Sequence, residues 1–491
     1  MTQNDKAARP AVRGKGRPFR LHKAAHDPRA AALLVLSRVL FDDIDSQAAL
    51  DEALHSPTMV PTDKKLCTEL VYGVLRYYLR LRAFTEKFLS KPEKLPEEMR
   101  LALCLALYEM ACLRIPHHAS VCWAVGHVRN RFGQGLARVA NGALRAMQRV
   151  LDDFSDIRSI SDPEGAEEEN LSRFYAMPVW IVRLWRQSYG AEAAAALLAA
   201  SLAAPPSGLR VNRACNGWEQ TRKELMQAYA PGHAGTVEPG AGRGDAEEMA
   251  LGGRNDGDIL PVGACGFAFP GPLPWQARIL IKEGKASRQS AASYDVLEAF
   301  VPGTWELPIW DCCAGRGGKT LALLEQGIAV ALASDPSRQR LNALPQEYAR
   351  LGLLTPPCPE TLPASVTEAI LQFDKRTGGQ QFGTILIDAP CSGLGTLSRH
   401  PEIRLRRTPE DLATVTAMQK EILAQAWERL KPGGCIVYIT CTLNPSENQE
   451  QIASFLQNHT DAELLKEFQT DFMSPVREFF YGARVRKKAG L

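Results

Sequence analysis

The sequence predicts a multidomain protein, in which an all-α N-terminal bundle is followed by an α/β domain with a Rossmann-like parallel sheet. Two observations support this fold class. Apolar residues recur at helical spacing through residues 27–150, and from about residue 290 short apolar strands alternate with helices. The chain has 491 residues, enough for several domains, and its 45% hydrophobic content is ordinary for a globular protein.

Composition narrows the possible functions. No apolar stretch is long enough to suggest a membrane span, and no apolar segment follows the basic start of the chain to form a secretory signal. The 12 cysteines include no C-x-x-C pair, so no metal site is expected. We therefore expect reduced thiols in a cytoplasmic protein.

Basic residues are concentrated at the N-terminus and on the predicted bundle. Residues 1–26 form a basic tail, which would either contact phosphates or remain solvated. In the bundle over residues 27–150, Asp27 can cap the first helix, and the last predicted helix exposes Arg138 and Arg145. RNA contact and an ordinary solvated face are both compatible with this pattern.

The next segments change in character. Residues 151–170 are acidic and poor in apolar anchors, which indicates a linker. Residues 171–285 resume helix and contain a short strand, so we expect a small α+β connecting domain. Within it, the glycine-rich stretch near 231–258 is typical of a mobile insertion.

The remaining residues, 286–491, are expected to form the α/β domain. Alternating strand and helix patterns follow one another along this segment. In order they are the strand "LPIWD", the helix "GGKTLALLEQ", the strand "IAVALASD", the helix "RQRLNALPQEYARLG", the strand "GTILIDAP", the helix "TPEDLATVTAMQKEILAQAWERL", the strand "CIVYITCT" and the helix "NQEQIASFLQNH".

A glycine loop, "IWDCCAGRGGKT", joins the first strand to its helix. A P-loop would need a glycine at Cys313, and a dinucleotide fingerprint would need one at Thr320, so both of these phosphate-binding patterns fail. S-adenosyl-L-methionine is the third candidate, because Asp335 ends the next strand, where an acid could hold ribose hydroxyls. Glycine loops and turn-forming acids are common, so these two features leave the cofactor open.

Two cysteines follow neighbouring strands of the predicted sheet. Cys391 comes after Asp388 in "DAPC", and Cys441 ends the next core strand in "YITCT". Carboxyl ends of parallel strands meet at one edge, where open α/β sheets bind ligands. A single cysteine there is usually inert packing, but two on one edge beside an acid favour a chemical role.

At this point the sequence resembles a known family. "DAPCSGLGTLSRHPEIR", "LKPGGCIVYITCTLNPSENQEQI" and "DCCAGRGGKT" resemble RNA cytosine-5 methyltransferases of the Rsm/Nop/Sun group. Residues 27–150, including "ANGALRAMQR", resemble a NusB-type RNA-binding bundle, and "MPVWIVRLW", "LRVN" and "EFFYGARVRKK" also match. The resemblance covers most of the chain and implies a class I methyltransferase domain after a NusB-like bundle.

The resemblance implies a role for each residue of the predicted site. Cys441 would add to carbon 6 of cytosine, which makes carbon 5 nucleophilic, and Cys391 would help to release the product. Asp388 would hydrogen-bond the cytosine edge and assist protonation at N3. The target base must leave any stack to enter the pocket.

The resemblance also implies partners. S-adenosyl-L-methionine would be held by Asp388, by Asp335 at the ribose, and by the loop residues Cys313, Ala314, Gly315, Arg316, Gly317, Gly318 and Lys319. The RNA would be 16S ribosomal RNA, contacted by Arg138, Arg145, Arg399, His400 and Arg484 of a monomer. The alternatives are a catalytically weakened RNA-binding or ribosome-assembly factor on the same fold, and a transfer-RNA cytosine-5 methyltransferase.

The sequence departs from the family at three places. Gly315-Arg316 replaces the usual Ala-Pro of the cofactor loop, and we hypothesise that Arg316 meets the methionine carboxylate or an RNA phosphate. Ser290 follows Gln289 where the family usually has an aspartate. Prolines 356, 357 and 359 interrupt an expected strand, and an acid for the adenine side is missing, Glu360 being the nearest substitute.

Overall fold

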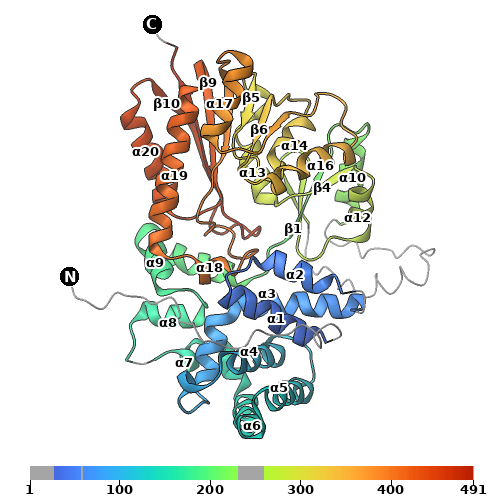
Figure 1. Ribbon diagram of the computed structural model, residues 1–491, viewed down its shortest axis with the longest axis vertical. Helices are drawn as coiled ribbons and strands as arrows, with labels where there is room; N and C mark the ends of the chain where they lie inside the picture. Colours follow the sequence, from blue (N-terminus) through green and yellow to red (C-terminus); the bar gives the residue numbers. More distant parts are fainter. Residues whose placement is uncertain (1–26, 57–58, 163, 230–258, 490–491) are drawn as a thin grey trace. The chain divides into compact units, whose positions relative to one another are not determined.

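The computed structural model describes residues 27–56, 59–162, 164–229 and 259–489 (Figure 1). The expected basic tail and the expected insertion near 231–258 lie outside the described residues. The chain divides into two compact units. Unit 1 comprises Met1–Leu202 and His400–Arg406, and unit 2 comprises Ala203–Arg399 and Arg407–Leu491. No described helix has the length and hydropathy needed to cross a membrane.

Unit 1 is helical, as the sequence predicts. Asp27 caps its first helix by accepting a hydrogen bond from the Arg29 N–H at 2.9 Å. The described helices are α1 (Pro28–Phe41), α2 (Ser46–Leu54), α3 (Pro61–Glu86), α4 (Glu97–Cys112), α5 (His117–Phe132), α6 (Gln134–Arg149), α7 (Ile157–Ile160), α8 (Glu167–Phe174), α9 (Val179–Leu202) and α18 (Ile403–Arg406), with the 3₁₀ turns η2 (Pro92–Lys94) and η3 (Leu151–Ser155).

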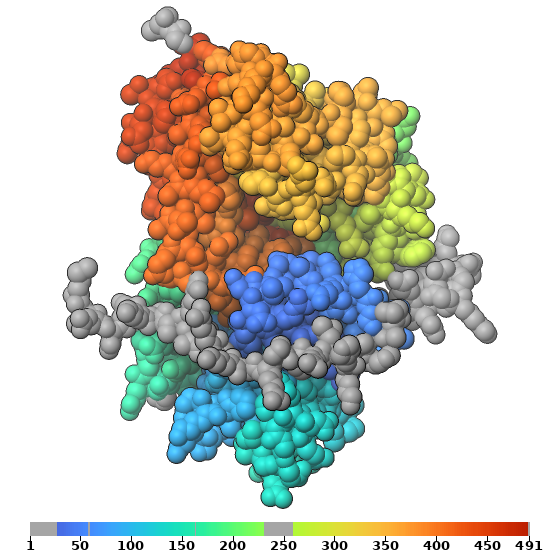
Figure 2. Space-filling view, in the orientation of Figure 1, coloured from blue at the N-terminus to red at the C-terminus, as the bar shows by residue number. Residues whose placement is uncertain are grey.

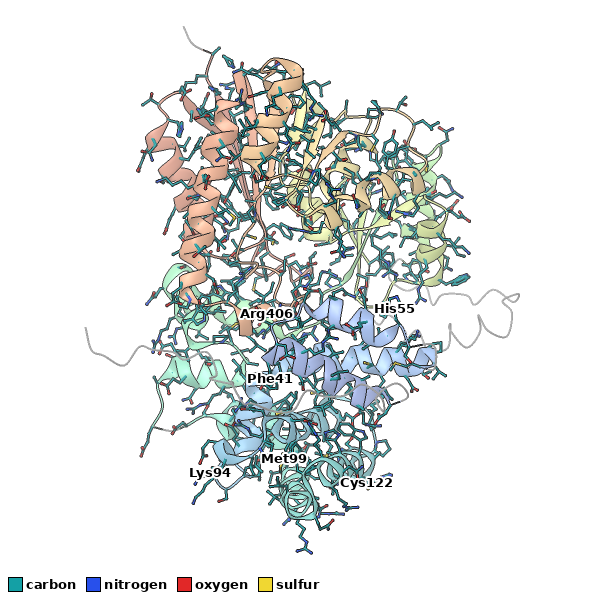
Figure 3. All side chains as sticks on the ribbon, viewed as in Figure 1. Phe41, His55, Lys94, Met99, Cys122 and Arg406 are labelled. Carbon is teal, nitrogen blue, oxygen red and sulfur yellow. The ribbon has the colours of Figure 1, made fainter. Side chains whose placement is uncertain are left out.

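Helix α4 is the centre of the bundle. Its residues from Met99 to Met110 are all buried, which confirms the prediction made from its nearly continuous apolar sequence. Met99 points into the interior, whereas Lys94 lies at the surface (Figure 3). Helix α3 packs closely against α4, because a Cβ at Gly73 would lie 2.0 Å from the Tyr108 ring.

Helix α18 packs within unit 1 although it is distant in sequence from the other helices. The Arg404 side chain is fully buried, and its guanidinium donates to the carbonyl oxygens of Ser201 at 2.8 Å and Ala176 at 3.4 Å. Arg406 donates to the carbonyl of Ile44 and pairs with Asp43 at 3.2 Å (Figure 3). Backbone carbonyls therefore anchor this short helix.

Unit 2 contains a small antiparallel sheet, of which the sequence predicted one strand. Its order is β2-β3-β1-β4, and β1 pairs with β3 through Ser207↔Phe269 and with β4 through Leu209↔Arg288. The elements are β1 (Ser207–Val211), β2 (Leu260–Val262), β3 (Gly266–Phe269), β4 (Ala286–Arg288), α10 (Trp218–Ala228) and α12 (Trp275–Lys282).

The second sheet of unit 2 has seven strands in the order β10-β11-β9-β8-β5-β6-β7. Its central and right-hand part, β9-β8-β5-β6-β7, is parallel, which confirms the predicted α/β class. Strands β11 and β10 extend the sheet beyond β9 through antiparallel pairs. The strands are β5 (Ile309–Asp311), β6 (Leu332–Ser334), β7 (Glu360–Leu362), β8 (Phe382–Asp388), β9 (Leu430–Thr440), β10 (Ala462–Gln469) and β11 (Tyr481–Lys487).

Helices cover both faces of this sheet (Figure 1). Ile385 and Tyr438 pack on one face with α17, α19 and α20, whereas Leu386 and Val437 pack on the other with α13, α14 and α16. The helices and turns are α13 (Ala291–Glu298), η4 (Pro302–Thr304), α14 (Gly318–Leu324), α15 (Arg338–Leu341), α16 (Ala343–Arg350), α17 (Val366–Thr377), α19 (Pro409–Glu428), η5 (Pro445–Glu447) and α20 (Gln449–Asn458).

Several details differ from the expected pattern. The expected linker over residues 151–170 is folded, since it contains η3, α7 and the start of α8 and buries Phe154 and Ile160. The expected connecting domain over 171–285 is divided, because its residues up to Leu202 belong to unit 1.

A single helix was expected over "RQRLNALPQEYARLG", but α15 and α16 are separate, because Pro345 has no N–H to donate to the Leu341 carbonyl. A strand does form next to the three prolines. It is the three-residue β7, which begins after Pro359 and lies at the edge of the sheet, where the prolines interrupt no central ladder.

Candidate active site

Two loops of unit 2 bring the predicted thiols together. Cys391 follows β8 and Cys441 follows β9, and these neighbouring strands are parallel, so both loops lie at the same edge of the sheet. The two Sγ atoms are 3.2 Å apart, and the Cys441 N–H donates to the Cys391 Sγ at 3.4 Å. The thiols therefore share a hydrogen bond.

Asp388 lies at the end of β8 and forms an ion pair with Lys319. The Lys319 Nζ is 2.6 Å from Asp388 Oδ2, and it lies 5.6 Å from the centre of the Phe480 ring. The Lys319 side chain is only 6% exposed, whereas Asp388 is 36% exposed, so water reaches this pair from the side of the carboxylate. The sequence placed Lys319 in the cofactor loop, and the structure adds its contact with the predicted acid.

The surroundings of Cys441 disfavour its thiolate. The hydrogen bond that the Cys441 thiol donates to Cys391, together with burial, raises the pKa of Cys441 well above its ordinary value, and the charge of Asp388 acts in the same direction. Lys319 opposes them and lowers that pKa. Cys441 is consequently a thiol at neutral pH in this arrangement, and it must lose a proton before it can act as a nucleophile.

A buried carboxylate that sequence reasoning missed ties the two thiol loops together. Glu447 accepts hydrogen bonds from the Ser392 N–H at 2.8 Å, from Gln419 Nε2 at 3.1 Å and from Asn444 Nδ2 at 3.0 Å. Ser392 and Thr442 follow the two thiols in sequence, and their hydroxyl oxygens are 2.6 Å apart. The polar turn around Glu447 is typical of an exposed loop, so the sequence carried no signal for this role.

A glycine allows three backbone segments to meet behind the thiols. The Gly395 N–H donates to the Cys441 carbonyl at 3.0 Å, and the Gly395 carbonyl accepts from the Phe479 N–H at 2.9 Å. A Cβ at Gly395 would lie 2.0 Å from the Phe479 carbonyl oxygen, so no other residue fits this position without a backbone shift.

The glycine loop between β5 and α14 lies next to the predicted ribose acid. Asp335 accepts hydrogen bonds from the Gly315 N–H at 3.1 Å and from the Ser337 N–H at 2.8 Å. Gly315 and Gly317 have φ values of +58° and +83°, a region that favours glycine. The glycine loop and Asp335 are therefore in contact in the structure, although a helix and a strand separate them in the sequence.

The loop leaves room for a ligand against its backbone. A Cβ built at Gly315 meets no described atom within 4 Å, and one built at Gly318 meets only Gln289 Nε2, at 3.9 Å. Each Asp335 oxygen accepts one backbone N–H, and Oδ1 also pairs with Arg340 at 3.4 Å, so Oδ2 has the more available lone pairs for a hydroxyl. These features fit a ligand with ribose hydroxyls and a polar tail.

Comparisons with known proteins identify the family of the chain. Family models match as follows: 16S rRNA methyltransferase RsmB/F over residues 301–478, the NusB family over 26–149, and the ferredoxin-like domain of RsmF/B-like methyltransferases over 177–241. Ribosomal RNA small subunit methyltransferase B of Vibrio cholerae is 32% identical over 450 residues, covering 89% of this chain and 91% of the relative. The chain belongs to the RsmB/F family of rRNA methyltransferases.

Further similarities support the family and the fold. Ribosomal RNA small subunit methyltransferase B of Shewanella oneidensis is 31% identical over 433 residues, covering 87% of this chain and 90% of the relative. The crystal structure of PH0851 has a TM-score of 0.65 at 20% identity and covers 94% of this chain and 99% of that chain. A methyltransferase homolog protein from Pyrococcus horikoshii has a TM-score of 0.51 at 22% identity, covering 66% of this chain and 99% of its own. These two structures show the fold.

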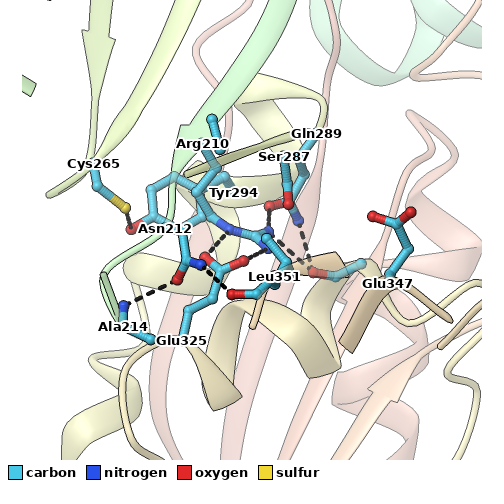
Figure 4. Close-up of polar contacts among 12 residues, drawn as sticks. Arg210, Asn212, Ala214, Cys265, Ser287, Gln289, Tyr294, Glu325, Glu347 and Leu351 are labelled. Carbon is cyan, nitrogen blue, oxygen red and sulfur yellow. Dashed lines mark hydrogen bonds and ion pairs between the residues drawn. The ribbon is translucent and has the colours of Figure 1, made fainter. Parts of the chain in front are cut away.

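In this RsmB/F-family chain, a buried arginine links the small sheet to the cofactor loop (Figure 4). Arg210 of β1 forms two bonds with Glu325, at 2.7 and 2.8 Å, and donates to the Gly318 carbonyl at 3.1 Å. It also donates to Gln289 Oε1. Both members of the ion pair are buried, and the sequence singled out neither of them.

The structure places the two residues that stand nearest to the missing family acids, Ser290 and Glu360. Ser290, in the place of the usual aspartate, caps α13 and donates from its hydroxyl to Glu478 Oε2 at 2.9 Å. Glu360 is the first residue of β7 and lies beside Leu332, the first residue of β6, whereas Asp335 follows the last residue of β6. Glu360 forms an ion pair with Arg376. Glu360 therefore cannot substitute for the adenine-side acid, while Ser290 retains a link to a carboxylate.

The predicted RNA-contacting residues are dispersed. Arg399, in unit 2, ends the loop that starts at Cys391 and forms two bonds with Glu478, at 2.7 and 2.9 Å. His400 is exposed, belongs to unit 1 and lies 3.6 Å from Glu402. Arg484 of β11 donates to Thr304 Oγ1 at 3.0 Å, away from the thiol edge.

The remaining predicted contacts lie on unit 1. Arg138 and Arg145 are exposed on α6, whose opposite face buries Ala140 and Leu144. This helix reaches the surface of unit 1 (Figure 2). Arg316, which distinguishes the cofactor loop of this family member, is also exposed. The thiols, Asp388 and the cofactor loop are thus gathered at one site, whereas the predicted RNA contacts are not.

Proposed function

We propose that this chain is an S-adenosylmethionine-dependent methyltransferase that makes 5-methylcytosine in 16S ribosomal RNA. The observation that carries this proposal is the pair of thiols with sulfur atoms 3.2 Å apart beside the Asp388–Lys319 ion pair. The relatives from Vibrio cholerae and Shewanella oneidensis, both named for small-subunit rRNA, support the choice of RNA. The expectations of a monomer and of a cytoplasmic location stay predictions.

The first step is nucleophilic addition. Carbon 5 of cytosine is too electron-poor to accept a methyl group unaided, so a thiolate must first add to carbon 6. Cys441 loses its proton, which the neighbouring Cys391 sulfur can accept across their hydrogen bond, and forms the sulfur–carbon bond. The displaced electron pair makes carbon 5 nucleophilic, and Asp388, held by Lys319, guides a proton to N3.

The cofactor, when bound, supplies an electrophilic methyl group to carbon 5. The loop from Cys313 to Lys319 would hold it, because the backbone at Gly315 and Gly318 is open to a ligand. Asp335 would accept the ribose hydroxyls with its free lone pairs. Arg316 is exposed beside this loop and would meet the methionine carboxylate or an RNA phosphate.

The last step restores the aromatic base. The first step leaves Cys391 protonated, so it must pass that proton to solvent before it acts again. Its thiolate then removes the proton from carbon 5, the electron pair re-forms the bond between carbons 5 and 6, Cys441 leaves as a thiolate, and the N3 proton returns to Asp388. One thiol adds and the other accepts protons, so the short distance between their sulfur atoms serves both steps.

Two cysteine variants test these roles. Cys441→Ser should abolish methylation, because a hydroxyl is a far poorer nucleophile near neutral pH. Cys391→Ala should retain the addition step and accumulate a covalent protein–RNA adduct, visible as a shifted band on a denaturing gel. Cys122→Ala, which removes an exposed thiol of unit 1, is the control. An adduct that forms only when Cys441 is removed would require the two roles to be exchanged.

The position of Glu360 favours a second candidate, a catalytically weakened RNA-binding or ribosome-assembly factor. Calorimetry with S-adenosylmethionine separates the two candidates, since the enzyme must bind the cofactor. Bisulfite sequencing of total RNA from cells that lack the protein then tests the substrate. Loss of one 16S rRNA methylation is expected, loss at a transfer RNA would change the substrate, and no loss anywhere would reject the enzyme.

A further inference from the structure

A basic cleft of about 470 Å³ lies beside the small sheet of unit 2. Its walls come from the start of β1, the end of β4, the loop after β3 and the end of the loop that follows β8. Three arginines line it, Arg278, Arg288 and Arg399, together with Gln289 and Ser290. None of the steps proposed above uses this cleft.

One positive charge in the cleft is unopposed. Glu478 is buried beside the cleft and neutralises Arg399 through two hydrogen bonds, at 2.7 and 2.9 Å. The Arg288 side chain is exposed and has no hydrogen-bond or ion-pair partner among the described residues. A guanidinium of this kind is suited to bidentate contact with a phosphate group.

The cleft adjoins the cofactor loop and shares a segment of chain with the thiol site. Gln289 follows Arg288 and donates from Nε2 to the Gly318 carbonyl of the cofactor loop at 3.4 Å. Arg399, in another wall, ends the loop that begins with the thiol of Cys391. A strand whose target base enters the thiol site must continue away from it, and its backbone carries one negative charge per nucleotide.

We propose that this cleft binds a backbone phosphate of the RNA strand next to the target nucleotide, with Arg288 as the principal contact. The proposal rests on the proposed function for the identity of the strand. Ser290, also in the cleft, is uncharged and donates a hydroxyl hydrogen bond to Glu478 at 2.9 Å, so it does not oppose the charge of Arg288.

The test measures RNA affinity of the full-length chain as a function of salt. Fluorescence anisotropy with a labelled, in vitro transcribed fragment of 16S rRNA gives log Kd against log salt concentration. Loss of one phosphate contact should lower the slope by about 0.7 and weaken binding severalfold at low salt. Arg288→Ala should show both changes while the Kd for S-adenosylmethionine stays the same. Lys375→Ala removes the same charge from the exposed face of α17 and should change neither.

A second variant guards against misfolding. Ser290→Asp keeps a residue that caps helix α13 but adds a negative charge to the cleft, so it should also weaken RNA binding. An unchanged affinity and slope in Arg288→Ala and Ser290→Asp would overturn the proposal, and would leave the cleft to another anion such as an acidic peptide.

The outcome is separable from the fate of the proposed function. RNA binding needs no methyl transfer, so a lower slope in Arg288→Ala supports the cleft even if the wild-type chain methylates no RNA. Conversely, if the wild-type chain methylates RNA but Arg288→Ala leaves the salt slope unchanged, the proposed role of the cleft is rejected and the proposed function stands.

Discussion

Cys391 influences the ionisation of Cys441 through the hydrogen bond that they share. This bond is the largest cause of the raised pKa of Cys441, ahead of burial. The proposed nucleophile is therefore held as a thiol in this arrangement. The arrangement keeps a reactive sulfur protonated between reactions, and the partner that suppresses it is also the nearest proton acceptor.

Removing Cys391 should make Cys441 easier to ionise. In Cys391→Ala the main cause of the raised pKa is absent, while Lys319 still lowers it. The rate of Cys441 alkylation by iodoacetamide, followed by mass spectrometry across pH 6 to 10, should reach its midpoint at a lower pH than in the wild type. Lys319→Met should move the midpoint in the opposite direction. Equal midpoints in all three proteins would show that the hydrogen bond does not control ionisation.

Asp311, at the end of β5, should make stability depend on pH. Burial raises its pKa from 3.8 to about 7, although Thr320 Oγ1 donates to it at 2.6 Å. Between these values the folded state holds a proton that the unfolded state has lost, so stability falls as pH rises, by up to about 1.4 kcal/mol per pH unit, and levels off above pH 7.

Asp311→Asn should remove this dependence, because asparagine keeps an acceptor for Thr320 and has no proton to lose. Urea unfolding at pH 5, 6, 7 and 8 would give the difference between the variant and the wild type. We expect that difference to grow in favour of the variant as pH rises. A difference that stays constant over this range would mean that the carboxyl titrates at its ordinary value.

At the scale of elements, the predictable parts are those with strong periodicity. The strands β5, β8 and β9 are apolar runs bounded by turn residues, and helices α14 and α19 have clear apolar stripes, so the sequence located them. The sequence missed β10, because its residues "AELLKEFQ" are half-buried or exposed and show no apolar face. The three-residue strands β2 and β4 are too short to carry a pattern.

The residues of the candidate site also divide into those that the sequence could locate and those that it could not. Its thiols, Asp388 and the glycine loop come from distinctive motifs at strand ends, so the amino-acid pattern alone is enough to locate them. Glu447 and Arg210 are charged residues that become buried only in the tertiary fold, and charge alone predicts a solvated surface. Residues that position a site are therefore harder to predict than residues that react in it.

Glu447 should be the most sensitive of these positioning residues. Glu447→Gln keeps the shape of the side chain but replaces one carboxylate oxygen with an amide NH2 group. That donor would face another donor, either the Ser392 N–H or Gln419 Nε2. An unsatisfied buried donor costs about 1–3 kcal/mol, so thermal unfolding should shift downward and methylation should fall. Because the loops would loosen, diamide should form the Cys391–Cys441 disulfide more slowly in the variant.

The matched control is Glu450→Gln, a neighbouring exposed position on α20. It removes the same charge and should change neither stability nor disulfide formation. Destabilisation of Glu447→Gln with wild-type disulfide kinetics would assign Glu447 to folding alone.

At the scale of the whole molecule, positive charge acts through separate clusters of residues and not through the net charge of the chain. The 491-residue chain has a formal net charge of only +3, so no long-range field attracts RNA. RNA binding, as proposed, would come from separate clusters, such as the exposed face of α6 in unit 1 and the basic cleft in unit 2. Phosphate contacts of this kind fix position without reading sequence, so in the proposed function the choice of nucleotide would fall to the site around the thiols.

The contribution of unit 1 can be measured in the full-length chain. Arg138 and Arg145 are exposed on one helix face, and each would release a counterion when it neutralises a phosphate. The double variant Arg138→Ala/Arg145→Ala should lower the salt slope of RNA binding by about 1.4, twice the effect of one contact to a single strand. Cofactor affinity should not change, since α6 belongs to unit 1 and the cofactor loop to unit 2. Lys91→Ala/Lys94→Ala removes two exposed charges from the turn before α4 and should leave the slope intact. If wild-type affinity were insensitive to salt, or if both double variants behaved alike, the bundle would not hold RNA through its α6 arginines.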